Sequence, residues 1–232
     1  MSRYLSLGAV VGPVVFTGIW LVLGFLSPGY RMWDIVVPSY SAISQPISGL
    51  GLGVTGPYMN TTFIACGVVL LLGVAGVVRQ VRGLTSRARW ITGVLLALTP
   101  LGMILDGIFT LESFVPHFLG YLLAMGGAIV AFFVAGRVFR RDPRWHGVAY
   151  VLPFASALTL LLFVVAQITF DPTAAGANVG IAGLTERILI VDVCAWYVLL
   201  GLVAYLPARS GAPEGLARVE GERPTANRQL EA

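Results

Sequence analysis

Three ionisable side chains lie close together in an apolar part of the sequence. The segment LDGIFTLESFVPHFLG, residues 105 to 120, contains Asp106, Glu112 and His117. A carboxylate can orient an imidazole ring, and the ring can then bind a charged group or move a proton. A second segment near the end of the chain, GLTERILIVDVCAW, adds three more charges: Glu186, Arg187 and Asp192. Any chemistry at these residues depends on the elements that bring the two segments together.

The composition predicts that those elements are membrane-spanning helices. Of the 232 residues, 57% are hydrophobic and 11% are charged, and the mean hydropathy is +0.85. Apolar runs of about 20 residues recur, long enough for a helix to cross a hydrocarbon core of about 30 Å. The predicted fold class is therefore all-α, a polytopic membrane protein with a six-transmembrane-helix bundle over residues 1–207. The spans are expected near residues 8–27, 58–78, 90–110, 117–136, 148–169 and 187–206.

The basic residues predict the orientation of the bundle. All fifteen are arginines, and within residues 1–207 most of them occupy the second and fourth connections. The other three connections hold only Arg31 and, at the edge of the sixth span, Arg187. The positive-inside rule then predicts a multi-pass protein of the cell (plasma) membrane with both termini in the cytoplasm. We expect the arginines to meet membrane lipids and no nucleic acid, because they are not interleaved with exposed aromatic residues.

Signatures of cofactor sites and of common enzyme classes are missing from the sequence. It contains no Gly-rich phosphate loop, no G-x-S-x-G and no H-E-x-x-H motif. The two histidines, His117 and His146, are expected on opposite faces of the membrane, so we predict no metal site and no cofactor. Cys66 and Cys194 fall inside spans and are expected to be packing residues. The tail, residues 208–232, is predicted to be disordered and cytoplasmic.

Small residues spaced four apart predict where helices touch. Gly8 and Gly12 form a GxxxG pair in the first span, and Gly120, Ala124 and Ala128 continue the spacing in the fourth. Small residues let helix backbones approach closely in lipid.

The predicted topology brings the charged residues to the outer side of the membrane. Asp106 lies one turn from the end of the third span, Glu112 lies in the outer turn, and His117 begins the fourth span. A charge at membrane depth costs several kcal/mol, so these groups should pair or line a wet cavity. Arg187 is the one cation expected within the spans, and we predict that it pairs with Asp106 across a helix interface.

Three segments resemble a known family. ISGLGLGVTGPYMNTTFIACGVVLL, GIFTLESFVPHFLGYLLA and GLTERILIVDVCAW are together similar to domain-of-unknown-function family 998 (DUF998), which contains multi-span prokaryotic membrane proteins. The resemblance covers residues 5–207 and implies fold and location without implying an activity. Two positions depart from the family pattern: Gly49 stands where an acidic residue is frequent, and TLES replaces a Pro-x-Asp turn. The residues that match the family motifs are Ser48, Asn60, Phe109, His117, Arg187 and Trp196.

Two classes of function fit these residues. In the first, a binding or transport-type module has a polar, outward-facing cavity for a lipid headgroup or a small amphiphilic ligand. Arg187 would contact an anion there, and His117 would tune binding through its protonation. The alternative is an intramembrane lipid hydrolase with a Ser/Asp/His arrangement. The proposed cluster comprises Asp106, Glu112, His117, Glu186, Arg187 and Asp192, supported by Ser48, Asn60, Phe109 and Trp196.

Structural roles for the same residues stay open at this stage. His117 could be an interfacial polar cap, and Asp106 with Arg187 could fix helix register. Trp196 could serve only in packing, and the serines before the second span could cap a helix. The sequence does not predict an oligomeric state.

Overall fold

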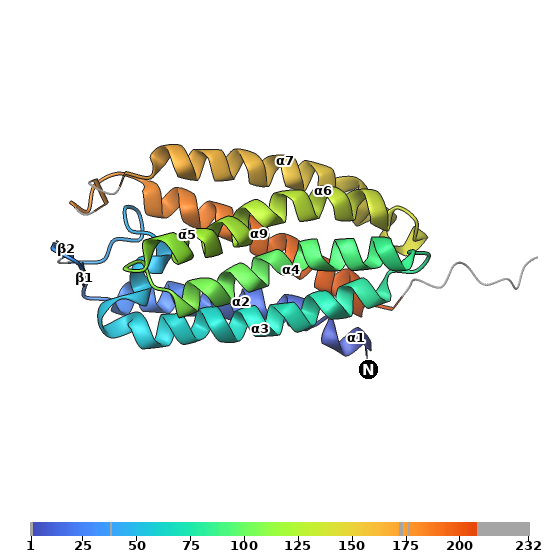
Figure 1. The fold of residues 1–232 in the computed structure, drawn as a ribbon, viewed down its shortest axis with the longest axis horizontal. Helices are drawn as coiled ribbons and strands as arrows, with labels where there is room; N and C mark the ends of the chain where they lie inside the picture. Colours follow the sequence, from blue (N-terminus) through green and yellow to red (C-terminus); the bar gives the residue numbers. More distant parts are fainter. Residues whose placement is uncertain (1, 38, 172–173, 176, 208–232) are drawn as a thin grey trace, which may run out of the picture.

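The chain folds into a bundle of long helices with a small hairpin at one end (Figure 1). The computed structural model describes residues 2–37, 39–171, 174–175 and 177–207. The N-terminal half contains α1 (Ser2–Leu5), α2 (Gly8–Leu26), β1 (Tyr30–Met32), β2 (Ile35–Val37), the 3-10 helices η1 (Ile47–Gly51) and η2 (Gly53–Thr55), α3 (Gly56–Gln80) and α4 (Ser86–Ile108). The C-terminal half contains α5 (Phe114–Tyr121), the π-helical segment η3 (Leu122–Gly126), α6 (Gly127–Phe139), the 3-10 helix η4 (Pro143–Trp145), α7 (His146–Thr169) and α9 (Ala182–Tyr205).

Six helical segments of the described chain are long and apolar enough to cross a membrane, which confirms the predicted fold class. Their large apolar side chains cover the outside of the bundle: Phe25, Phe154 and Ile168 are between 75% and 90% exposed. Such a surface is stable in lipid and not in water. The helix α9 begins at Ala182, whereas the sequence placed the start of the sixth span near residue 187. Glu186 and Arg187 therefore belong to the second turn of a helix. The predicted tail, residues 208–232, lies outside the described residues.

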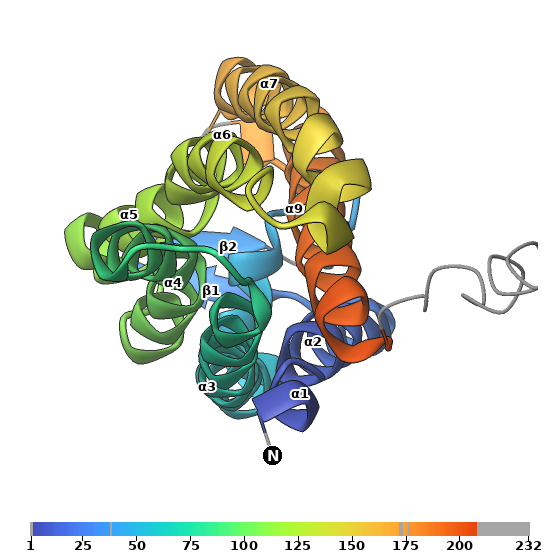
Figure 2. The same cartoon turned by 90° about the vertical axis from the view of Figure 1, so that its right-hand side faces the viewer.

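The six spans form a closed ring (Figure 2). Each span packs against the next along the chain, and α9 closes the ring by packing against both α7 and α2. Aromatic side chains fill the centre, where the rings of Phe132 and Tyr197 lie 5.5 Å apart at an interplanar angle of 58°. A tilted pair of this kind packs favourably in an apolar core. The last span therefore touches both the first part of the chain and the part just before it.

The predicted small-residue contacts are confirmed. A Cβ atom placed on Gly8 would lie 2.3 Å from the carbonyl oxygen of Val69, and one on Gly12 would lie 2.9 Å from that of Cys66. These contacts join α2 to α3. Gly120 packs against α4, where a Cβ atom on it would lie 3.0 Å from the carbonyl oxygen of Gly102. Backbone approach this close is possible only without side chains at the contact.

A proline within α4 creates a polar anchor for α9. Pro100 has no N–H, so it cannot donate to the carbonyl of Leu96 one turn earlier. The buried hydroxyl of Tyr197 donates to that carbonyl at 2.8 Å. The bond satisfies two buried polar groups at once and fixes the depth of α9 against α4.

The two ends of the bundle differ in charge. The α3–α4 and α6–α7 connections lie at the same end as α1, and we call this the arginine-rich end (Figure 1). Two of its arginines cap helices: Arg89 donates to the carbonyl of Val78 at 3.0 Å, and Arg144 donates to that of Ala204 at 3.0 Å. Cations near helix C-termini satisfy carbonyls that have no partner within the helix. The opposite end carries the β1–β2 hairpin, and we call it the hairpin end.

The chain between α2 and α3, residues 27–55, forms what we call the first connection. It contains the two short 3-10 helices η1 and η2 directly before α3. The hairpin was not predicted. Its strands are antiparallel and pair Tyr30 with Val37, and Trp33 in the turn adopts a positive φ of 51°. Tyr30, Val37 and Leu52 form a small apolar cluster that fastens the hairpin to η2.

Candidate functional site

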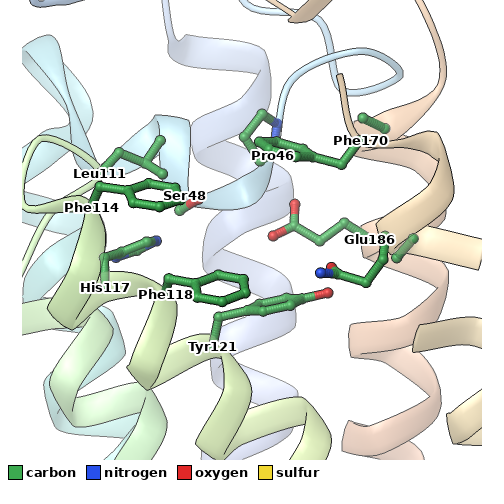
Figure 3. Close-up of a pocket in the computed structure, with 12 residues that line it drawn as sticks. Pro46, Ser48, Leu111, Phe114, His117, Phe118, Tyr121, Phe170 and Glu186 are labelled. Atoms are coloured by element: carbon green, nitrogen blue, oxygen red, sulfur yellow. The ribbon is translucent and has the colours of Figure 1, made fainter. Parts of the chain in front are cut away.

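A cavity of about 200 Å³ lies at the hairpin end of the bundle (Figure 3). Its walls come from α5, the end of α7, the start of α9 and the first connection. Most of the wall is apolar, as expected of a site for a small organic ligand. The lining residues are Pro46, Ser48, Leu111, Phe114, His117, Phe118, Tyr121, Ala166, Gln167, Phe170, Ala182 and Glu186.

A smaller cavity of about 30 Å³ lies deeper in the ring and shares part of this wall. Ser48, His117, Tyr121 and Glu186 line both cavities. The inner cavity adds Asp106 and several core residues, and its volume suffices for one or two water-sized groups. The two cavities are therefore neighbouring parts of one site. Both have mostly apolar walls, and the polar side chains of Ser48, His117, Tyr121 and Glu186 are common to both.

The ring of His117 is fixed by the end of α4. Its Nδ1 atom lies 2.7 Å from the carbonyl oxygen of Phe109 and 3.6 Å from Oδ1 of Asp106. A carbonyl can only accept, so Nδ1 carries a proton, and in the neutral ring Nε2 is the basic atom. His117 therefore presents an acceptor at the cavity wall.

Asp106 is buried next to His117 and is incompletely satisfied. Its side chain is 7% exposed, and its Oδ1 atom accepts no hydrogen bond from the described residues. Gly120 makes room for it, because a Cβ atom on Gly120 would lie 2.1 Å from Oδ1. A buried acceptor without a partner is costly and uncommon, and it indicates a functional role when it lines a cavity.

Glu186 joins α9 to the first connection. Its Oε2 atom accepts a hydrogen bond of 2.8 Å from the backbone N–H of Ile47, the first residue of η1. The first N–H groups of a helix have no partner within it, so a carboxylate is a favourable cap. The other oxygen, Oε1, has no hydrogen-bond partner among the described residues, and the carboxylate points into the cavity (Figure 3).

The π-helical segment η3 follows directly on the site. It begins at Leu122, immediately after Tyr121, and π-helical turns inside α-helices are frequent at functional sites. The hydroxyl of Thr99 donates at 2.7 Å to the carbonyl of Ala124 within this segment. Tyr121 was missed by the sequence analysis, although it lies four residues after His117 and therefore on the same helix face.

Three further polar side chains face the outer cavity without an internal partner. Ser48, Tyr121 and Gln167 make no side-chain hydrogen bond within the described part of the chain, and all three line the cavity. Figure 3 shows the hydroxyl of Tyr121 directed towards the α9 side of the site. Ser48 and Tyr121 are half-buried and Gln167 is exposed, and a ligand or water can supply hydrogen bonds to all three.

The predicted pair between Arg187 and Asp106 is wrong. The Nη1 atom of Arg187 donates instead to the carbonyl oxygens of Ala42, Gln45 and Gly183, at 2.7, 2.8 and 2.8 Å. Its guanidinium carbon also lies 5.4 Å from the ring centre of Trp20. Carbonyl oxygens and an aromatic face thus take the place of a carboxylate, and Nε of Arg187 has no partner among the described residues. Arg187 lines neither cavity and holds the first connection in place.

Gln45 is the second anchor of the first connection. Its side-chain oxygen accepts a hydrogen bond from the hydroxyl of Tyr30, and its side-chain nitrogen donates to the carbonyl of Ala175. Burial, with a smaller effect of Glu186, raises the pKa of Tyr30 to about 12, so its hydroxyl stays protonated and can donate. The Tyr30 ring also occupies the space beside Gly49.

The remaining predicted residues lie outside the cavities. Glu112 is exposed in the α4–α5 turn. Asp192 lies about 15 Å into α9 and accepts hydrogen bonds from Thr159 at 2.6 Å and from Trp196 at 2.9 Å. Asn60 donates at 3.1 Å to the carbonyl of Gly51. Of the predicted cluster, the structure therefore brings together Asp106, His117 and Glu186, with Ser48 beside them.

The two histidines lie at opposite ends of the bundle. His146 begins α7 at the arginine-rich end, where its Nε2 atom lies 3.0 Å from the carbonyl oxygen of Arg140. Among the described residues no three His, Cys, Asp or Glu side chains are close enough to hold a metal ion.

A ring of six apolar helices with a partly polar cavity defines a multi-pass membrane protein. Residues 10–203 match the family described as protein of unknown function (DUF998), and the chain belongs to this family. The resemblance found in the three sequence segments is thereby confirmed. No curated protein and no solved structure matches the chain.

Proposed function

We propose that the protein is a binding or transport-type membrane module whose cavity receives a small amphiphile or a lipid headgroup. The observation that supports it is the group of unsatisfied polar side chains, Ser48, Tyr121 and Gln167, on the wall of an otherwise apolar cavity. The polar part of a ligand would meet these groups and the polar atoms of His117 and Glu186. Its apolar part would contact the aromatic residues of the outer wall.

The position of the cavity suits a ligand that arrives from the membrane. Phe114, Phe118 and Phe170 line it and are 53%, 38% and 43% exposed at the surface of the bundle. Exposed aromatic side chains at the edge of a spanning bundle contact lipid. An acyl or alkyl chain could thus stay in lipid while its polar end enters between α5, α7 and α9. Arg187 lines neither cavity, so the proposed site does not use its guanidinium group to bind an anion.

The proposal predicts that filling the cavity abolishes binding. Ala166 is 4% exposed and lines the cavity, so Ala166→Leu places extra volume where the ligand would lie. Native mass spectrometry of protein released from lipid nanodiscs, titrated with decanol, decylammonium and decanoate, measures retention of each probe. We expect at least one probe to bind the wild type, with about tenfold weaker binding to Ala166→Leu.

The matched control is Val165→Leu, which adds bulk at the neighbouring residue on the lipid-facing side of α7. It should bind like the wild type. Equal retention of every probe by the wild type and by Ala166→Leu would refute the proposed cavity.

A second candidate, an intramembrane lipid hydrolase, is favoured by one observation. Ser48, His117 and Asp106 line the same inner cavity, and Nδ1 of His117 lies 3.6 Å from Oδ1 of Asp106. A hydroxyl, a base and an orienting carboxylate are the groups that acyl transfer uses. Mass spectrometry of nanodisc lipids after long incubation distinguishes the candidates. Cleaved lipid that disappears in Ser48→Ala supports the hydrolase, whereas intact lipid with a bound probe supports the binding module.

We further propose that the arginine-rich end faces the cytoplasm of a cell that carries this protein in its plasma membrane. The support is the arginine distribution, since connections rich in arginine remain on the cytoplasmic side. Reporter fusions after Gln80, Glu112 and Arg141 test this orientation. We expect the fusion after Glu112 to be active outside the cytoplasm and the other two to be active inside. A cytoplasmic signal from the Glu112 fusion would reverse the topology.

A further inference from the structure

We propose that the polar group recognised at the inner end of the cavity is a cation, of the class of a protonated primary amine on an apolar chain. Glu186 and Asp106 would hold this ammonium group. The inference rests on the proposed binding function and adds the chemical class of the ligand.

The titratable side chains around the cavities favour a cationic ligand over an anionic one. The titratable side chains that line the inner and outer cavities are Asp106, His117, Tyr121, Glu186, Cys194 and Tyr197. Two of these are carboxylic acids and none is an arginine, while the whole chain contains no lysine. Arg187 follows Glu186 in sequence, but its guanidinium group is occupied by the carbonyls of the first connection. An anionic ligand would therefore lie beside two acids with no basic side chain but His117 in the wall.

Asp106 provides independent support. It is more than nine-tenths buried, it lines the inner cavity, and its Oδ1 atom has no hydrogen-bond donor among the described residues. Nδ1 of His117, which carries a proton, lies 3.6 Å away and is directed to the carbonyl of Phe109. A buried carboxyl group without a partner is stabilised by a cation brought to it.

The other unsatisfied atoms complete the site for an ammonium group. A primary ammonium carries three N–H donors and no acceptor. Oε1 of Glu186 is an acceptor with no partner in the described chain, and the ring of His117 and the hydroxyl of Tyr121 can also accept. The site thus offers several acceptors at the wall of a cavity too small for a large headgroup. A volume of about 200 Å³ is below the usual range for drug-sized ligands, so it suits a compact ammonium and the first carbons of its chain.

The test compares three probes of equal chain length that differ only in charge. Decylammonium, decanol and decanoate are titrated against the protein in nanodiscs of zwitterionic lipid at neutral pH, and native mass spectrometry gives the apparent Kd of each. We expect decylammonium to bind at least about tenfold more tightly than decanol, and decanoate to bind most weakly. Empty nanodiscs and Ala166→Leu measure non-specific partitioning.

Two substitutions test whether Glu186 and Asp106 cause the preference for decylammonium. Glu186→Gln keeps an oxygen that can accept from the N–H of Ile47, so the fold is preserved while the charge is removed. Asp106→Asn replaces the second carboxyl group at nearly the same volume. We expect each variant to reduce the advantage of decylammonium over decanol to about threefold or less. Glu112→Gln, at an exposed acid that lines neither cavity, is the matched control and should leave the advantage unchanged.

The outcomes separate this inference from the proposed function. Decanol or decanoate binding as tightly as decylammonium would overturn the cation preference and leave the binding cavity intact. An ammonium preference that persists in both Glu186→Gln and Asp106→Asn would also overturn it. If no probe is retained above the level of Ala166→Leu, the proposed function itself fails.

Discussion

Arg187→Ala is expected to lower the free energy of unfolding by about 3 kcal/mol, because the guanidinium group connects α9 to the first connection. The change removes hydrogen bonds to the carbonyls of Ala42 and Gln45, and to the hydroxyl of Tyr40. The buried carbonyl of Gln45 would lose its charged donor and keep the full cost of its desolvation. Arg187→Lys should recover only part of the loss, since an ammonium group cannot reproduce the planar set of donors.

Unfolding by SDS titration in mixed micelles measures these differences. Arg31→Ala, at an exposed arginine of β1, is the matched control and should change stability by less than about 0.5 kcal/mol. The double variant with Asp106→Asn distinguishes the observed contacts from an ion pair. The two losses should add, because the two side chains do not contact each other. Recovery of stability in the double variant would contradict the described role of Arg187.

Gly73→Ala should destabilise the bundle by about 3 kcal/mol, because the added methyl group meets backbone and not a flexible side chain. A Cβ atom at this position would lie 2.0 Å from the backbone nitrogen of Ala9 and 2.5 Å from the carbonyl carbon of Gly8. Neither atom can move unless α2 and α3 separate. The separation would also disturb the contact of Gly8 with Val69, so the loss extends along the interface.

Gly18→Ala is the matched control for this change. Gly18 lies in α2, and a Cβ atom on it would have no neighbour within 4 Å. Alanine favours a helix over glycine by up to about 1 kcal/mol, so this variant should be neutral or slightly more stable. The same SDS titration gives both values. A Gly73→Ala protein as stable as Gly18→Ala would show that the two helices tolerate a wider spacing.

The number of membrane-spanning helices was predictable from the sequence, because each helix can be recognised from a run of consecutive residues. Span length, the arginine distribution and the four-residue spacing of Gly8 and Gly12 are all local in sequence. They set the number of helices and one of the contacts between them. The hairpin was not predicted, because its stability comes from packing Tyr30 and Val37 against Leu52 rather than from its own short strands.

The site was predictable only in part. Asp106 and His117 are near in sequence, and the predicted topology placed Glu186 at the same side of the membrane. In the structure all three line the inner cavity. The partner of Arg187 was predicted wrongly because the sequence suggested only carboxylates. The actual partners are backbone carbonyls, which every residue has and which no residue type reveals.

The contacts of Arg187 also bear on how the protein is made. A chain is synthesised from its N-terminus, so residues 42–45 are complete long before α9 exists. Until α9 enters the membrane, the carbonyls of Ala42 and Gln45 lack their arginine, and the N–H of Ile47 lacks the carboxylate of Glu186. Residues 46–48 supply Pro46 and Ser48 to the cavity wall. They therefore reach their final conformation only after α9 is in place, although they are among the first to be translated. A ribosome that stops before the sixth span leaves five inserted helices without a finished cavity.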